Sequence, residues 1–192
     1  MKENVRSRIN SLRPLLKDPV PEVRIAAAEA IEKLETTSSV AGIIATLKTG
    51  NMGARVGAIY ALGEIGGEKV LPPLVYCARR PEADIRSAAA AALGRLALPE
   101  ALTALMELLD DENSTVQSRA IAALRNFPAT PEILKKLRPF LSASDGVLEA
   151  EAALTLAELD DQHSLGQIHE LLMSHHASTR QAAAVALSII HF

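Results

Sequence analysis

The sequence has few of the residues on which several common kinds of functional site depend. Aromatic side chains make up 3% of the 192 residues, with two Tyr, three Phe and no Trp. Such a chain offers few rings on which nucleic-acid bases could stack. Its single cysteine, Cys77, excludes a disulfide within the chain and is typical of a reducing compartment. We interpret Cys77 as a small buried hydrophobic residue.

The sequence also lacks a strong charge bias and a long apolar run. Its formal net charge is −3, far from the basic excess of a nucleic-acid-binding protein. The longest uncharged runs, such as Gln181 to Phe192, have about a dozen residues, whereas a membrane-spanning helix needs about 20. The N-terminus has no apolar segment of the kind found in a signal peptide. We therefore expect a cytoplasmic protein with no nucleic-acid partner and no membrane segment.

Recognisable catalytic, metal-binding and cofactor-binding motifs are missing as well. No serine lies in a Gly-x-Ser-x-Gly string, and no glycine-rich phosphate loop is present. Four histidines cluster near the C-terminus, namely His163, His169, His175 and His176. Their spacing does not align them on one helical face, so they do not form the convergent ligand set of a metal site. We interpret them as surface residues and predict no enzymatic activity, no metal and no cofactor.

What the sequence does contain is a repeat of about 31 residues that occurs six times. One position, called the anchor here, sets the register and is usually arginine. The anchors are Arg24, Arg55, Arg86, Gln117, Glu149 and Arg180. Every unit has Ala three residues after its anchor and Ile or Leu seven residues after it. A fixed period of this length predicts one array of stacked units, with repeats of approximately 1–36, 37–67, 68–98, 99–129, 130–161 and 162–192.

Each unit is predicted to contain two helices, an A helix before the anchor and a B helix after it. In the second unit, apolar residues at helical spacing occupy 38–48, a polar turn follows, and a second apolar stripe runs over 53–65. Gly66-Gly67 then ends the helix, since glycine tolerates the left-handed conformation of a C-terminal cap. Pro14 and Pro139 lie ten residues before their anchors, inside A helices. Each proline predicts a tolerated kink.

Four strings carry a resemblance to a known family: Asp18-Pro19-Val20-Pro21-Glu22-Val23-Arg24, Ala26-Ala27-Ala28-Glu29-Ala30-Ile31, Ala61-Leu62-Gly63-Glu64-Ile65-Gly66 and Ala92-Leu93-Gly94-Arg95-Leu96. They resemble HEAT repeats, in particular the short bacterial HEAT-like repeats of the PBS-lyase type. The resemblance covers essentially Val5 to Ile190. It implies an all-α fold, a right-handed α-solenoid of six two-helix HEAT-like repeats (an armadillo-type superhelix). The B helices would line its concave side and the A helices its convex side.

The resemblance also implies a structural role for the anchor arginines. In the family, an arginine at this position pairs with acidic residues in the loop of its own or a neighbouring repeat. The candidate partners here are Asp18, Asp84 and Asp111. Gln117 and Glu149 depart from the pattern, so any ladder of such pairs should be interrupted there.

The concave face is the candidate binding surface. B-helix positions two, five, eight and nine residues after the anchor are expected to point away from the core, over a floor of small residues such as Gly63 and Gly94. Tyrosine and arginine are enriched at binding hot spots. The candidate partner-binding residues are Tyr60, Glu64, Arg95, Arg119, Arg125, Asn126 and Glu158.

We interpret the chain as a non-enzymatic scaffold that binds another protein along this concave face. An alternative, implied by the resemblance, is an accessory or lyase-like subunit related to the phycobilin lyases, which handle tetrapyrrole attachment. DNA binding, as in HEAT-type DNA glycosylases, is disfavoured by the net charge and the few aromatic residues.

The C-terminal helix suggests a second contact surface, because no charged residue follows Arg180. Terminal repeats of a solenoid normally need a polar outer face. Four residues should suffice to cover the preceding repeat: Ala183, Ala184, Leu187 and Ile190. Val185, Ile189 and Phe192 are then left as candidate oligomer contacts, and a homodimer through the C-terminal repeat is the simplest closed arrangement.

Overall fold

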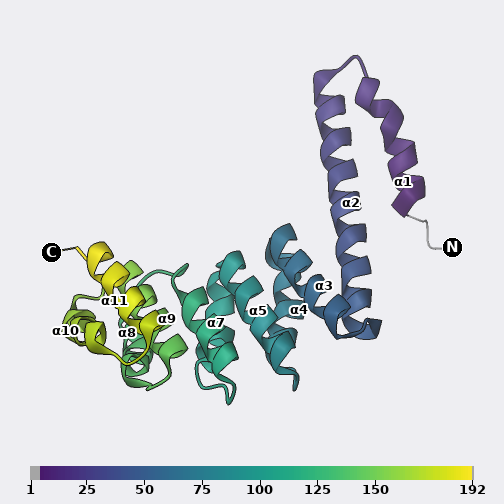
Figure 1. Cartoon of the computed structure of the whole chain (residues 1–192). Helices are drawn as coiled ribbons and strands as arrows, with labels where there is room; N and C mark the ends of the chain where they lie inside the picture. Colours follow the sequence, from purple (N-terminus) through teal and green to yellow (C-terminus); the bar gives the residue numbers. More distant parts are fainter. Residues whose placement is uncertain (1–4, 192) are drawn as a thin grey trace. The chain divides into compact units, whose positions relative to one another are not determined.

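The computed structural model describes residues 5–191, apart from the side chain of Arg6. The described residues form α-helices and short 3-10 helices joined by turns, with no β-strand among them (Figure 1). The predicted all-α class of paired helices is therefore confirmed. The chain divides into two compact units, Met1–Ala58 and Ile59–Phe192, which are described separately below. The division falls within helix α3 (Met52–Ile65).

The first unit is built around one long helix. Helix α1 (Val5–Leu12) and the 3-10 helix η1 (Arg13–Lys17) lie along α2 (Pro21–Thr49) (Figure 1). The sequence predicts a kink at Pro14. In the structure the helix changes there from α to 3-10 geometry, beginning at Arg13. Little of this helix is buried: Ala27 is the only buried residue of α2.

Helix α2 runs unbroken through the approximate boundary expected between the first two repeats, 1–36 and 37–67. The segment from Thr36 to Ser39 contains neither glycine nor proline, so nothing in it forces the backbone out of the helix. The Thr37 hydroxyl donates a hydrogen bond of 2.7 Å to the carbonyl of Lys33, which satisfies it within the helix. The B helix expected in the first repeat and the A helix expected in the second are therefore one helix. The apolar stripe of this unit is left partly exposed, as Leu16 (41%) and Ile25 (59%) illustrate.

The second unit follows the predicted alternation of A and B helices. The A-side elements are η2 (Glu68–Val70) with α4 (Leu71–Ala78), η3 (Pro99–Ala101) with α6 (Leu102–Leu108), α8 (Pro131–Leu137) with η4 (Arg138–Ser142), and η5 (Gln162–Ser164) with α10 (Leu165–Glu170) and η6 (Leu171–Met173). The B helices are α5 (Ala83–Leu96), α7 (Ser114–Leu124), α9 (Gly146–Glu158) and α11 (Ala177–Ile189). At Pro139 the A helix again changes from α to 3-10 geometry, as predicted.

Helix ends in this unit follow the local sequence. The Asn113 and Asp145 side chains accept hydrogen bonds from the first backbone N–H groups of α7 and α9. Three turns that lead from a B helix to the next A helix contain a left-handed residue eleven positions after the anchor: Gly66 (φ 69°), Ala97 (φ 48°) and Asp160 (φ 54°). The capping role predicted for Gly66 is thus confirmed, and the same turn geometry recurs without glycine.

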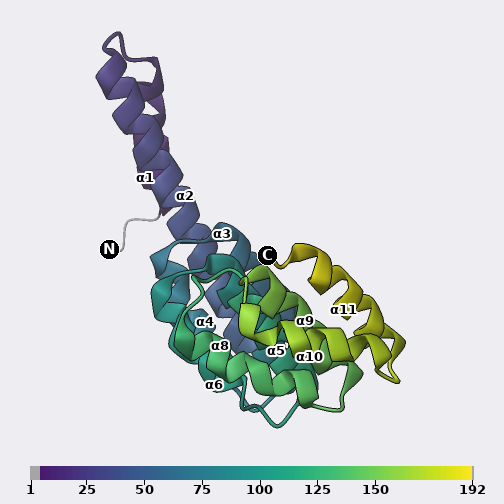
Figure 2. The ribbon, with the colours of Figure 1, turned by 90° about the vertical axis from the view of Figure 1, so that its left-hand side faces the viewer.

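Stacking of the B helices forms the core of the second unit. Helices α5, α7, α9 and α11 contact one another in that order (Figure 1), and Figure 2 views the same helices after a turn of 90°. The predicted register is confirmed, because the leucines seven residues after the anchor in α5, α7 and α9 have no exposed surface: Leu93, Leu124 and Leu156. The alanines three residues after the anchor are equally buried in these helices and in α11.

Two glycines bring consecutive B helices close together. A Cβ atom added to Gly94 would lie 2.5 Å from the Cβ and 2.8 Å from the Cα of Ala123. A Cβ atom added to Gly63 would lie 3.0 Å from the Cβ of Ala92. These two glycines therefore serve close helix packing and do not leave space on the concave face. They are buried contact points between one B helix and the next.

We predict that Gly94→Ala destabilises the protein by about 1–3 kcal/mol, because the added methyl group overlaps the backbone of α7. Gly166→Ala is the matched control, since it is a helical glycine with no neighbour within 4 Å of an added Cβ. It should be neutral or stabilising by up to about 1 kcal/mol. Denaturant midpoints measure both changes. A Gly94→Ala variant as stable as the parent would show that the two helices do not meet at this residue.

Candidate protein-binding surface

The anchor arginines hold the loops between A and B helices. In three repeats the Nη1 atom donates hydrogen bonds to the carbonyl oxygens six and five residues earlier. The acceptors are Asp18 and Pro19 for Arg24, Arg80 and Pro81 for Arg86, and Ser174 and His175 for Arg180, at 2.6–3.1 Å. Each guanidinium thereby ties the loop to the first turns of its B helix. This arrangement is called the loop clamp below.

The carboxylate pairing implied for the anchors occurs at Arg86. Its Nε and Nη2 atoms donate to the two carboxylate oxygens of Asp111, in the next repeat, at 2.7 and 2.9 Å. Burial alone raises the pKa of Asp111, but hydrogen bonds from Arg86 and the Asn113 N–H outweigh burial, so this pKa lies below its ordinary value. Asp18 contributes its carbonyl group to the clamp, and its carboxylate accepts from the Val20 N–H. Asp84 is exposed and forms no ion pair with the described residues.

The ladder is interrupted at Gln117 and Glu149, as expected. The Gln117 side chain donates to the carbonyl of Leu109 at 3.0 Å. Glu149 carries a negative charge and accepts hydrogen bonds, whereas an arginine carries a positive charge and donates them. Its Oε2 atom accepts from the hydroxyls of Thr179 at 3.0 Å and Ser174 at 3.4 Å.

Another bidentate pair, Arg138–Asp161, lies within the fifth repeat, and Ser164 of the sixth repeat joins it. Arg138 donates from Nε and Nη2 to the carboxylate of Asp161 at 2.8 and 2.7 Å, and the Ser164 hydroxyl donates to the same carboxylate. Asp161 is only 2% exposed. Burial raises the pKa of Asp161. Hydrogen bonds from Arg138, Ser164 and the His163 N–H, together with the charge of Arg138, outweigh burial, so this pKa lies below its ordinary value.

We predict that Asp161→Asn destabilises the protein at pH 7 by about 1–3 kcal/mol, because it removes the charge from hydrogen bonds to a buried group. The folded-state pKa of Asp161 lies below the unfolded value of about 3.9. The stabilisation is therefore present above about pH 4 and is lost as the pH falls through the folded-state pKa. Urea midpoints at pH 7 and about pH 3 should show the penalty shrinking in acid. Asp110→Asn, at a carboxylate that is 72% exposed and pairs with Lys136, should cost less than about 1 kcal/mol. An Asp161→Asn penalty that is equal at both pH values would contradict the assignment.

The structure brings several of the candidate binding residues together in pairs within the chain. Glu64 and Arg95 form an ion pair between α3 and α5. Arg125 pairs with Glu158 at 3.3 Å and with Glu151 at 2.9 Å, so α7 is tied to α9. Asn126 donates from Nδ2 to the carbonyl of Gly94 at 3.1 Å. Five of the seven candidates are thus held by neighbouring repeats: Glu64, Arg95, Arg125, Asn126 and Glu158.

Tyr60 and Arg119 are the two candidate residues that remain available to contact a partner. Tyr60 is 46% exposed. Arg119 is exposed and forms no hydrogen bond or ion pair with the described residues. It lines a shallow hollow of about 300 Å³ between the first turns of α7 and α9. The same hollow contains Val147, which is 57% exposed.

Sequence reasoning missed Val147, although a signal for it was present. Val147 lies two residues before its anchor, at the start of α9. The equivalent residues in the other repeats are polar or glycine: Glu22, Gly53, Asp84, Thr115 and Ser178. An apolar side chain at this exposed position departs from the repeat and marks the hollow beside Arg119.

The C-terminal helix is partly as expected. Of the four residues expected to cover the preceding repeat, Ala183 and Ile190 are buried, Leu187 is partly buried and Ala184 is exposed; Ala182 and Ala186 are buried as well. Val185 is 45% exposed and Ile189 is partly exposed. Phe192 lies outside the described residues. The role of these three residues as oligomer contacts stays a prediction.

Two kinds of site are not found in the described part of the chain. No three or more His, Cys, Asp and Glu side chains there are placed to hold a metal ion. None of the described helices is both long and apolar enough to cross a membrane.

Comparison with known proteins identifies the family. The family model for HEAT repeats matches residues 9–86, 40–125 and 72–151, which together span 9–151. The chain therefore belongs to the HEAT-repeat family. The search of curated proteins finds no match.

Several solved structures share the fold. A chain of the complex of CpcE and CpcF of phycocyanin lyase from Nostoc sp. PCC7120 superposes with a TM-score of 0.65 at 21% identity, covering 79% of this chain and 99% of that one. A designed armadillo repeat protein in complex with the peptide (KR)4 has a TM-score of 0.59 at 18% identity, covering 96% of this chain and 100% of that one. An engineered protein superposes with a TM-score of 0.53 at 22% identity, covering 95% of this chain and 96% of that one. At these identities the likeness concerns the fold alone.

Proposed function

We propose that the protein is a non-enzymatic scaffold that binds another protein along the exposed face of its B helices, centred on Arg119 and Val147. The observation that carries this proposal is the contrast between Arg119 and the charges around it. Arg95 and Arg125 are neutralised by carboxylates of this chain. Arg119 is exposed, has no partner among the described residues and stands beside an exposed valine over a hollow.

The paired charges support the proposal because they fix the surface before a partner arrives. Arg125 is held by two carboxylates and by the carbonyl of Ala122, so little side-chain entropy is left for binding to remove. A partner with an acidic side chain next to an apolar one would match Arg119 and Val147. Tyr60 is the further exposed aromatic on this face, on helix α3. Solenoids commonly use such an extended surface for binding.

Known relatives in fold support a binding role in general terms. The two solved structures with the higher TM-scores above are described as complexes, one of CpcE with CpcF and one of a designed armadillo repeat protein with a peptide. Those assemblies are properties of those proteins. For this chain they support the choice of a scaffold over an isolated structural domain.

The experiment is capture of partners from the native cell extract with the parent protein, Arg119→Glu and a matched control. Lys135→Glu makes the same charge change at an exposed residue of α8, away from the hollow. We predict that proteins captured by the parent are retained by Lys135→Glu and are reduced at least about tenfold by Arg119→Glu, as for loss of a charged hot-spot contact. Circular dichroism checks that both variants are folded. Equal capture by Arg119→Glu and the parent would exclude this face.

A second candidate function is that of an accessory or lyase-like subunit that handles a tetrapyrrole. The observation in its favour is the likeness in fold to a chain of the phycocyanin lyase complex. We predict no visible absorption band shift when a bilin is mixed with the protein, because the exposed B-helix face has few aromatic residues to hold a conjugated ring. A saturable shift at equimolar bilin would replace the scaffold proposal with this one.

A further inference from the structure

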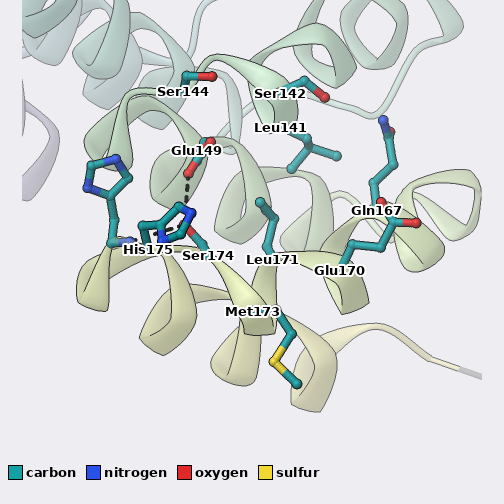
Figure 3. A pocket seen from close by; sticks show the side chains of 11 residues that line it. Leu141, Ser142, Ser144, Glu149, Gln167, Glu170, Leu171, Met173, Ser174 and His175 are labelled. Atoms are coloured by element: carbon teal, nitrogen blue, oxygen red, sulfur yellow. Dashed lines mark hydrogen bonds between the residues drawn. The ribbon is translucent and has the colours of Figure 1, made fainter.

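A pocket in the fifth and sixth repeats lies apart from the face that contains Arg119. It has a volume of about 430 Å³ and is bounded by η4, the first turn of α9, α10, η6 and the loop that follows η6. Glu149 and Ser174 lie at one end of it, Gln167 and Glu170 at the other, with Leu141 and Leu171 between them (Figure 3). The pocket therefore has a carboxylate at each end and an apolar middle.

Glu149 forms no ion pair with the described residues, although His175 and His176 line the same end of the pocket (Figure 3). The residue is 8% exposed, and its Oε2 atom accepts hydrogen bonds from two neutral hydroxyls, those of Thr179 and Ser174. Its Oε1 atom has no hydrogen-bond partner among the described residues. The nearby Arg180 directs its guanidinium to the carbonyls of Ser174 and His175 instead. A largely buried carboxylate without a cation is costly unless a ligand supplies one.

The repeat itself indicates which cation fits. Glu149 occupies the anchor position, where Arg24, Arg86 and Arg180 each place a guanidinium in a loop clamp. The Arg86 guanidinium also donates two hydrogen bonds to the carboxylate of Asp111. In the fifth repeat the anchor itself is a carboxylate, and Ser174 stands six residues before the next anchor, where Asp111 stands beside Arg86. The loop of the fifth repeat is also different, because Ser144 has a φ of 55° where the loops of Arg24 and Arg86 have proline.

We propose that this pocket binds the guanidinium group of an arginine side chain presented by a partner protein. The guanidinium would pair with Glu149 and reach the serine hydroxyls at the same end, since its planar fork suits a carboxylate better than a lysine ammonium does. The aliphatic stem of the arginine would lie over Leu141 and Leu171. The arginine supplied by the partner would take the place of the anchor arginine that this repeat lacks.

The chemistry at the other end of the pocket favours a protein-borne arginine over free arginine. Glu170 lines that end. The α-carboxylate of the free amino acid would be directed toward this like charge, whereas a peptide has neutral amides there. The site goes beyond the scaffold surface proposed above, and Arg119 takes no part in it.

The test is a titration of the full chain with acetyl-Ala-Arg-Ala-amide, followed by the backbone amide shifts of Gly146 and of residues 174–176. The matched ligand control is the same peptide with citrulline, which keeps the shape but loses the charge. We expect saturable binding of the arginine peptide and a dissociation constant at least about tenfold weaker for the citrulline peptide, as for loss of a charge-assisted hydrogen bond. Free L-arginine should bind more weakly than the arginine peptide.

Variants separate binding from folding. Glu149→Gln can still accept the hydroxyl of Thr179, so it should stay folded while the affinity for the arginine peptide falls at least about tenfold. Glu132→Gln makes the same charge change at an exposed glutamate outside the pocket and should leave the affinity unchanged. Arg119→Glu should also leave it unchanged, so failure of this site and failure of the scaffold surface are distinguishable.

Three results would overturn the proposal. Equal binding of the arginine and citrulline peptides would show that the pocket does not recognise a guanidinium. Unchanged affinity in folded Glu149→Gln would show that Glu149 only links α9 to α11 through Thr179. Free L-arginine binding as tightly as the peptide would make the ligand a small molecule and the partner-protein assignment wrong.

Discussion

The close approach of consecutive B helices is the constraint on which the rest of residues 59–192 depends. One pair of helices cannot bury its own apolar stripe, so each repeat must cover the next. Gly94 meets Ala123 and Gly63 meets Ala92 at distances that leave no room for a larger side chain. Because the helices meet at small residues, the leucines on either side of the contact reach complete burial.

This close spacing also organises the polar parts of the unit. Side chains close to these glycine–alanine contacts reach the next repeat. Glu64 therefore pairs with Arg95, and Arg125 pairs with Glu151 and Glu158. At the first turns of α5 and α11, a loop clamp fixes the connection to the preceding A helix. Among the B-helix residues discussed above, Arg119 and Glu149 form no ion pair with the described residues, and both occur where the repeat departs from its own pattern.

Much of the fold could be predicted because periodicity reports burial directly. Ala three residues after the anchor is buried in α5, α7, α9 and α11, and Leu seven residues after it is buried in α5, α7 and α9. The continuity of α2 could not be predicted from the period, because the period implies a turn that the residues from Thr36 to Ser39 do not encode. The candidate site was predicted less well. Helical spacing places Arg95 and Arg125 on an exposed face, but only three-dimensional neighbours reveal that these arginines are already paired, whereas Arg119 is not.

Native-state hydrogen exchange tests the central claim that burial between stacked repeats, rather than helix length, stabilises this protein. Helix α2 has 29 residues with one buried, whereas α7 has 11 residues with six buried. If stacking governs stability, the central amides of α7 will exchange more slowly than those of α2, because their opening requires loss of the packed core. Equal or greater protection in α2 would contradict the account.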